Sequence, residues 1–188
     1  MTEDVNSWKW WDKIANLWKD KGDDRDRPDE YKLLAEMMEG DGSVLEVGCG
    51  FGTFCMYTPM STHYLGMDVS EQMVQEARQR FPTRMFLRGD ITRAPVGQWG
   101  RTFAWSACFQ TLEHFDRETC LLVVEKLMAV ARRGLVFSLP AEPARAHKGH
   151  VLEWASEAEV LDFFGGFGSA EAHTFGTHYI GRILHAEG

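Results

Sequence analysis

The chain has 188 residues, 44% hydrophobic and 26% charged, which is typical of a globular protein with one well-packed core. No apolar run approaches the roughly 18 residues of a membrane span, and the first residues lack the apolar stretch of a secretory signal. A formal charge of −8 argues against a broad nucleic-acid-binding surface. The four cysteines lack the spacing of a metal site and are expected to be reduced thiols in the cytoplasm.

Aromatic residues crowd the first forty positions, which hold four of the seven tryptophans. Helical spacing predicts a helix there, with one apolar face made of Trp10, Trp11, Ile14, Leu17 and Trp18. A second helix is expected over residues 30–39, ending at Gly40. Residues 1–40 are therefore expected either to cap one edge of the core or to close over a ligand as a lid, and both interpretations stay open.

From residue 43 onward, strand-like and helix-like stretches alternate. Strands are predicted over 43–48, 63–69, 83–90, 101–108, 134–139, 169–176 and 179–187. This alternation predicts a parallel, doubly wound α/β sheet. The last two strands, joined by a turn at Thr177 and His178, predict an antiparallel hairpin.

The intervening helices have recognisable starts. Ser70 is expected to cap a helix over residues 71–81, and Ser156 with Glu159 is expected to form a capping box. A further helix is expected to begin near Asp116, with its inward residues at Leu121, Val124, Met128 and Ala131.

The stretch VLEVGCGFGTF, residues 44–54, carries glycines at alternate positions after the first strand. A glycine turn between strand and helix lets the backbone approach a ligand, as in the nucleotide sites of doubly wound sheets. Asp68, which ends the second strand, supplies a carboxylate that can accept both hydroxyls of an adenosine ribose. Thr53 stands where a dinucleotide fingerprint needs a small residue, so a dehydrogenase is the weakest alternative, and no GK[ST] motif follows.

Four motifs, VLEVGCGFG, YLGMDVS, FLRGDIT and ACFQTLEHF, occur in an order that resembles the class I S-adenosylmethionine-dependent methyltransferases. The segment HVLEWASEAEV is similar to one that is frequent in members acting on small molecules. The resemblance implies a seven-stranded, mostly parallel Rossmann-like sheet with an antiparallel closing hairpin. It also implies one methyltransferase domain over residues 1–188, with its core over 41–188, and S-adenosyl-L-methionine as the cofactor.

The resemblance assigns cofactor contacts position by position. Glu46 is expected to support the glycine loop, and Phe109 to lie close to the sulfonium. The remaining expected contacts are Gly48, Cys49, Gly50 and Gly52 on the methionine side, Asp68 at the ribose, and Val69, Met73, Asp90 and Ile91 around the adenine. The exocyclic amine of adenine is a donor, so a carboxylate acceptor at Asp90 is chemically suitable.

Methylation of a hydroxyl or a protonated amine also needs a base. His114 is the first candidate, because neutral histidine takes a proton near pH 7. His147 and His150, in the loop after the fifth strand, are further candidates. Trp11, Trp18 and Trp154 are candidates to line a pocket for a planar acceptor, although core or lid packing alone would also account for them.

Some O-methyltransferases of RNA ends and of quinone precursors carry E-x-x-E-H, which binds a divalent metal. The corresponding stretch here runs from Gln110 to His114, and the glutamine replaces the first acid. Losing one carboxylate weakens a site for a hard cation, so no metal ligand is expected. His150 nevertheless resembles the additional histidine of the RNA-end enzymes.

The expected function is transfer of a methyl group from S-adenosylmethionine to an oxygen or nitrogen of a small-molecule acceptor. One alternative is a non-catalytic S-adenosylmethionine-binding protein or regulatory subunit. Another is a metal-assisted O-methyltransferase acting on an RNA end or a quinone-type hydroxyl. No membrane partner is expected and nucleic acid is disfavoured, while the acceptor and the oligomeric state are left open by the sequence.

Overall fold

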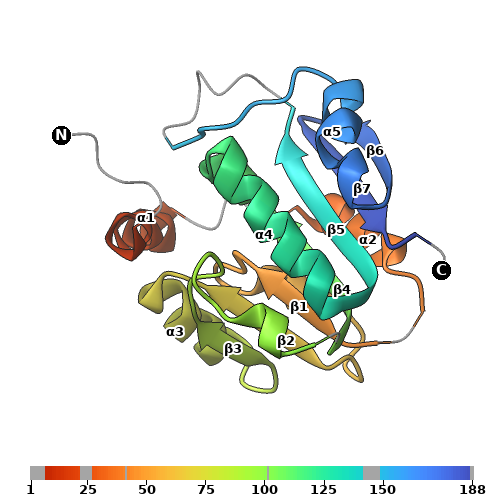
Figure 1. Ribbon diagram of the computed structural model, residues 1–188. Helices are drawn as coiled ribbons and strands as arrows, with labels where there is room; N and C mark the ends of the chain where they lie inside the picture. Colours follow the sequence, from red (N-terminus) through yellow and green to blue (C-terminus); the bar gives the residue numbers. More distant parts are fainter. Residues whose placement is uncertain (1–6, 22–26, 41, 101, 142–148, 187–188) are drawn as a thin grey trace.

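A seven-stranded sheet with helices on both faces forms the framework of the protein in a computed structural model (Figure 1). The structure describes residues 7–21, 27–40, 42–100, 102–141 and 149–186. The strands lie in the order β3-β2-β1-β4-β5-β7-β6. Strand β7 runs antiparallel to both of its neighbours, and the other pairs are parallel. The predicted doubly wound, mostly parallel sheet with a closing hairpin is confirmed.

The strands in chain order are β1 (Val44–Val47), β2 (Tyr64–Asp68), β3 (Met85–Arg88), β4 (Phe103–Phe109), β5 (Ala131–Pro140), β6 (Ser169–Phe175) and β7 (His178–Leu184). The central strand β1 is buried along its whole length because helices cover both faces of the sheet. Strand order reverses between β1 and β4, and a crevice at such a point is where doubly wound sheets bind ligands.

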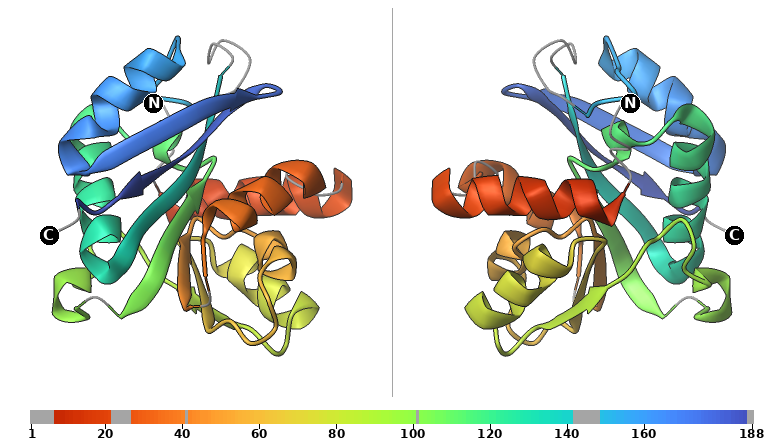
Figure 2. Two further views of the ribbon diagram at one scale, coloured as in Figure 1. Left: turned by 90° about the vertical axis from the view of Figure 1, so that its right-hand side faces the viewer. Right: turned by 90° about the vertical axis from the view of Figure 1, so that its left-hand side faces the viewer.

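Helices cover both faces of the sheet (Figure 2). One face carries α2 (Pro28–Met37) and α3 (Glu71–Arg80), and α1 (Trp8–Lys21) packs on α3. The other face carries α4 (Arg117–Val130) and α5 (Glu157–Phe164). Short 3₁₀ segments complete the connections: η1 (Thr53–Tyr57), η2 (Val96–Gln98), η3 (Leu112–His114) and η5 (Gly165–Phe167). None of the helices in the described ranges is long and apolar enough to cross a membrane.

The predicted helix starts are confirmed by their hydrogen bonds. Ser70 Oγ accepts from Met73 N at 3.2 Å, and Asp116 Oδ1 accepts from Thr119 N at 2.8 Å. Ser156 Oγ accepts from Glu159 N at 3.2 Å. These caps satisfy N–H groups that have no partner inside their helices, so each of the three helices begins at a defined residue.

Two details of the predicted packing are wrong. Leu17 is 55% exposed, because α1 rests on α3 and the glycine loop with a narrow face that includes Ile14 and Trp18. Ala131 is not in a helix: α4 ends at Val130, and β5 begins at once by pairing Ala131 with Phe103. The fifth strand therefore starts three residues earlier than predicted.

Candidate active site

The three glycines after β1 all have left-handed backbones. The φ angles of Gly48, Gly50 and Gly52 are +74°, +53° and +78°. A Cβ atom at position 48 would lie 2.1 Å from Thr111 Oγ1, and one at position 52 would lie 2.6 Å from the Phe86 ring. Only glycine satisfies both the conformation and the space at these two positions.

The carboxylate of Asp68 connects this loop to the start of α3. Its Oδ2 accepts from Gly50 N at 2.8 Å, and its Oδ1 accepts from Ser70 N at 2.9 Å. Asp68 is buried, and it lies at the carboxyl end of β2 as predicted. One side chain therefore fixes the shape of the glycine turn and also presents a carboxylate at the sheet edge.

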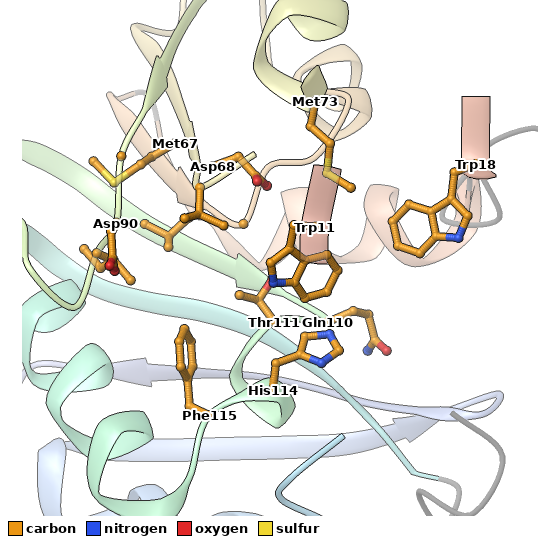
Figure 3. A pocket seen from close by; sticks show the side chains of 15 residues that line it. Trp11, Trp18, Met67, Asp68, Met73, Asp90, Gln110, Thr111, His114 and Phe115 are labelled. Carbon is orange, nitrogen blue, oxygen red and sulfur yellow. The ribbon is translucent and has the colours of Figure 1, made fainter. Parts of the chain in front are cut away.

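A pocket opens at this edge, beneath α1 (Figure 3). It encloses about 670 Å³, including the part open to solvent. Its walls are Trp11, Trp18, Val47, Gly48, Met67, Asp68, Val69, Met73, Gly89, Asp90, Ile91, Gln110, Thr111, His114 and Phe115. Aromatic and aliphatic side chains thus surround a few polar groups.

The candidate cofactor residues fall into two groups. Those in the pocket wall are Gly48, Asp68, Val69, Met73, Asp90 and Ile91. Those that do not line the pocket are Glu46, Cys49, Gly50, Gly52 and Phe109, from β1, the glycine loop and the end of β4. Phe109 points away from the pocket into the core, where its ring lies 4.6 Å from Phe54 and 6.0 Å from Tyr31. Gln110 and Thr111, the next two residues, occupy the wall instead.

Glu46 lies under the glycine loop rather than in the pocket. It is 3% exposed and accepts a hydrogen bond from the Tyr64 hydroxyl of the neighbouring strand. Burial and the Glu46 carboxylate raise the pKa of Tyr64 well above its usual range, so this hydroxyl stays protonated and remains a donor.

Asp90 follows β3 in a tight turn of its own. Its Oδ1 accepts from Thr92 N at 2.9 Å and from Thr92 Oγ1 at 2.7 Å, and its Oδ2 lies 3.5 Å from Arg93 Nε. These contacts hold the carboxylate at the rim of the pocket, beside the buried side chain of Ile91.

Helix α1 forms the wall opposite the sheet. Trp11 and Trp18, two turns apart on one face, both line the pocket, and in Figure 3 Trp11 lies between Met73 and His114. Asp12 fixes the helix to the core by accepting from Ser70 Oγ at 2.5 Å. Trp154, the third candidate tryptophan, packs in the core against Phe163 instead.

Two of the candidate histidines lie next to each other. The His114 and His150 rings are 5.2 Å apart, and the Trp11 ring lies 4.7 Å from His114. Nδ1 of His114 is 3.0 Å from the Gly149 carbonyl, which can only accept, so Nδ1 carries the proton of the neutral ring. Nε2 of a neutral His114 therefore has a lone pair. His147 lies outside the described residues.

A buried carboxylate completes this cluster. Glu113 is 1% exposed, and ligand atoms of Glu113, His114 and His150 all lie within 4.8 Å of one another. The backbone gathers them, because Val151 N and Leu152 N donate to the Glu113 carbonyl at 2.7 and 3.0 Å. The sequence indicated Glu113 only through the motif comparison, and nothing in it showed that residue 150 would return to residue 113.

The four cysteines are buried, and none of them forms a disulfide. Burial and the nearby Glu113 carboxylate raise the pKa of Cys120 to about 12, and burial likewise raises the pKa of Cys55 to about 12. These thiols therefore stay protonated and unreactive at neutral pH.

Comparisons with known proteins agree with this geometry. Residues 44–134 match a family model described as a methyltransferase domain. No curated protein sequence matches the chain.

Several solved structures share the fold. The PH0226 protein of Pyrococcus horikoshii is 16% identical, with a TM-score of 0.68 over 99% of this chain and 95% of that one. Magnesium protoporphyrin IX methyltransferase of Synechocystis PCC 6803, solved with bound SAH, is 16% identical, with a TM-score of 0.64 over 98% of both chains. The methyltransferase domain of bacterial CtHen1-C is 14% identical, with a TM-score of 0.66 over 85% of this chain and 97% of that one. The chain therefore carries a methyltransferase domain over residues 44–134 and has the fold of class I S-adenosylmethionine-dependent methyltransferases.

Proposed function

We propose that this enzyme binds S-adenosylmethionine in the pocket beneath α1 and methylates an oxygen or nitrogen of a small-molecule acceptor. The observation that carries the proposal is that one pocket joins Gly48, the Asp68 carboxylate and the His114 imidazole. A carboxylate offers about four acceptor sites, so Asp68 can hold the loop amides and also receive ribose hydroxyls.

The pocket supplies what methyl transfer needs. The sulfonium methyl is already activated by its positive charge, so holding the acceptor in line with the departing sulfur provides much of the rate. The methyl passes to the acceptor atom, the sulfur keeps the bonding electron pair, and the acceptor releases a proton. In this proposal His114, with His150 beside it, takes that proton at Nε2, and the contact of its Nδ1 with the Gly149 carbonyl supports the role.

Binding of S-adenosylhomocysteine, the product left after the donor loses its methyl group, tests the cofactor site. Calorimetric titration with S-adenosylhomocysteine should show binding by the wild type and at least tenfold weaker binding by Asp68→Ala, because hydrogen bonds to a charged group are lost. Asp162→Asn, an exposed acid on α5, serves as the control and should bind like wild type. Undiminished binding by Asp68→Ala would rule out this site.

Labelled methyl donor tests the chemistry. Once an acceptor is found by screening hydroxyl- and amine-bearing compounds, His114→Ala should lower its methylation by roughly 10²–10⁴-fold while leaving S-adenosylhomocysteine binding unchanged. A variant that keeps its full rate would exclude His114 as the proton acceptor.

The cluster of Glu113, His114 and His150 favours a second candidate, a metal-assisted O-methyltransferase. Two imidazoles and one carboxylate are a donor set that suits divalent first-row transition metals, and His114 also lines the pocket. A bound metal would lower the pKa of an acceptor hydroxyl. Titration of the purified protein with Mn²⁺ should then show a site that His150→Ala removes and His173→Ala, an exposed histidine on β6, retains. Equal Mn²⁺ binding by both variants would exclude this candidate.

A further inference from the structure

A lysine of α4 holds the turn that follows β3. Lys126 Nζ donates to three backbone carbonyls, those of Ile91 at 3.0 Å, Thr92 at 2.7 Å and Ala94 at 3.0 Å. An ammonium group has three N–H bonds and no acceptor, so this turn takes all of them. Lys126 is half-buried, and these hydrogen bonds offset the loss of water around its charge. The lysine is therefore committed to the turn.

The turn of residues 90–94 is also closed by its own hydrogen bonds. The Asp90 carbonyl accepts from Arg93 N at 3.1 Å and from Ala94 N at 2.8 Å, while Asp90 Oδ1 accepts from Thr92 N at 2.9 Å. These bonds use N–H groups of the turn, and its carbonyls converge on Lys126. Carbonyl oxygens gathered at one point repel each other, and a cation between them replaces repulsion by attraction. The shape of the turn therefore depends on the charge of Lys126.

The first two residues of this turn belong to the pocket. Asp90 and Ile91 both line it, and Figure 3 shows the Asp90 side chain in the wall. Oδ1 of Asp90 accepts two hydrogen bonds from Thr92. Oδ2 lies 3.5 Å from Arg93 Nε, an ion pair that water weakens because the Arg93 side chain is 89% exposed. Oδ2 is therefore the oxygen that can take a ligand donor in place of its present partner.

We propose that Lys126 is a positioning residue of the cofactor site, which holds the turn of residues 90–94 so that Asp90 Oδ2 receives the exocyclic amine of adenine. The inference rests on the proposed function and deepens it, because it names the group that gives the site its selectivity for an aminopurine. Asp90 and Ile91 contact the base. Lys126 does not line the pocket and acts through them.

Selectivity separates this role from a purely structural one. A lysine that served only the stability of the fold would, when removed, weaken the binding of related ligands by the same factor. A lysine that positions Asp90 changes the ratio between a ligand with the amine and a ligand without it. The ratio of two dissociation constants is therefore the quantity to measure.

The two probes are S-adenosylhomocysteine and its analogue whose purine carries hydrogen in place of the 6-amino group. In calorimetric titrations the wild type is expected to prefer S-adenosylhomocysteine by about tenfold, the scale of one hydrogen bond to a charged acceptor. Lys126→Met keeps the apolar stem without any N–H and should reduce this preference to about threefold or less. Lys32→Met, the same change at an exposed lysine of α2, should keep the wild-type ratio.

A double-mutant cycle tests whether Lys126 acts through Asp90. Asp90→Ala removes the acceptor of the amine, so this variant should bind both probes with nearly equal affinity. Lys126→Met in the Asp90→Ala background should then change the ratio no further. An Asp90→Ala variant that kept the wild-type preference would overturn the proposal, because another group would be recognising the amine.

Two further results would overturn it. One is a wild type that does not distinguish the two probes. The other is an unchanged ratio in Lys126→Met, even if both probes bind more weakly than to the wild type. If Lys126→Met does not melt cooperatively, Lys126→Gln replaces it, since this side chain keeps two N–H donors without the charge. It should also lower the preference, and an unchanged ratio in that variant would overturn the proposal.

A measurement on the ligand-free protein separates this proposal from the proposed function. The backbone amides of Thr92 and Ala94, which donate to Asp90, should exchange with solvent about tenfold faster in Lys126→Met than in the wild type. The amide of Thr119, held by the cap of α4, should exchange at the same rate in both proteins. Unchanged exchange in the turn would overturn the positioning role even if S-adenosylhomocysteine binds. Faster exchange confined to the turn, in a protein that does not bind S-adenosylhomocysteine, would support the positioning role and contradict only the proposed function.

Discussion

Gly48 is the most constrained residue of the pocket. It combines a φ of +74° with a distance of only 2.1 Å between Thr111 Oγ1 and the place that a Cβ atom would take. Strand β1 and the end of β4 can approach each other at the pocket only because this residue has no side chain. The position therefore couples backbone conformation to the spacing of the two strands that form the site.

Gly48→Ala is expected to lower the free energy of unfolding by about 2–5 kcal/mol. Roughly 1–2 kcal/mol comes from the left-handed backbone, and about 1–3 kcal/mol from overpacking against Thr111. Urea unfolding measures the loss. Thr111→Ala in the same chain should restore part of it.

Gly176→Ala separates the two contributions. Gly176 has a φ of +59° in the turn between β6 and β7, and nothing lies within 4 Å of the place that its Cβ would take. This variant should lose only the backbone part, about 1–2 kcal/mol. Equal losses at positions 48 and 176 would contradict the packing argument for Gly48.

At the scale of elements, helix α1 is both a structural cover and a wall of the pocket. Its inner face buries Ala15 against Phe51 and Met73, and the same face places Trp11 and Trp18 in the pocket. The contacts of this segment are therefore compatible with both interpretations, a cap on the core and a lid over a ligand. Its role in ligand binding stays a prediction.

Trp18→Ala is expected to weaken S-adenosylhomocysteine binding by roughly two- to tenfold, the scale of one aromatic contact. Leu17→Ala, one residue away on the same helix, should leave binding unchanged because Leu17 faces solvent. Calorimetry compares the two dissociation constants. If Leu17→Ala weakened binding as much as Trp18→Ala, helix stability rather than the pocket wall would be the cause.

Elements that depend on local sequence were predictable, and those that depend on tertiary contacts were less so. The caps at Ser70 and Asp116 follow from side chains that bond their own helix, so the sequence contains the signal. Leu17 was assigned to the wrong face because helical periodicity does not tell how wide the covered face is. The early start of β5 at Ala131 depends on its pairing with Phe103, which no local pattern encodes.

At the scale of the whole molecule, the Glu30–His178 pair joins a helix of one layer to the closing strand of the sheet. Glu30 lies on α2 and His178 begins β7. Because the pKa of Glu30 is lowered in the folded state below its ordinary value of 4.5, its charged form stabilises the fold. That contribution is complete above the unfolded-state pKa and is lost as the pH falls through the lower folded-state value.

The stability difference between wild type and Glu30→Gln should follow this dependence. It is expected to be constant at neutral pH and to shrink as the pH falls below about 4.5. Urea unfolding at a series of pH values measures it. A difference that grew on acidification would contradict the assignment of the charged form to the folded state.

The pocket was predictable because parallel strands deliver their carboxyl ends to one edge, so residues following β1, β2, β3 and β4 meet there. The cluster of Glu113 with His150 could not be predicted, because it depends on the backbone hydrogen bonds from residues 151 and 152 to Glu113.

The place of α1 in the chain has a consequence for the order of assembly. This helix precedes its partners in the chain: Ser70 follows Asp12 by 58 residues, and His114 comes later still. A short isolated helix is marginal in water until it can pack. During synthesis α1 therefore stays undocked, with its tryptophans exposed, until the glycine loop and α3 have formed. It then packs against them and completes the wall of the pocket.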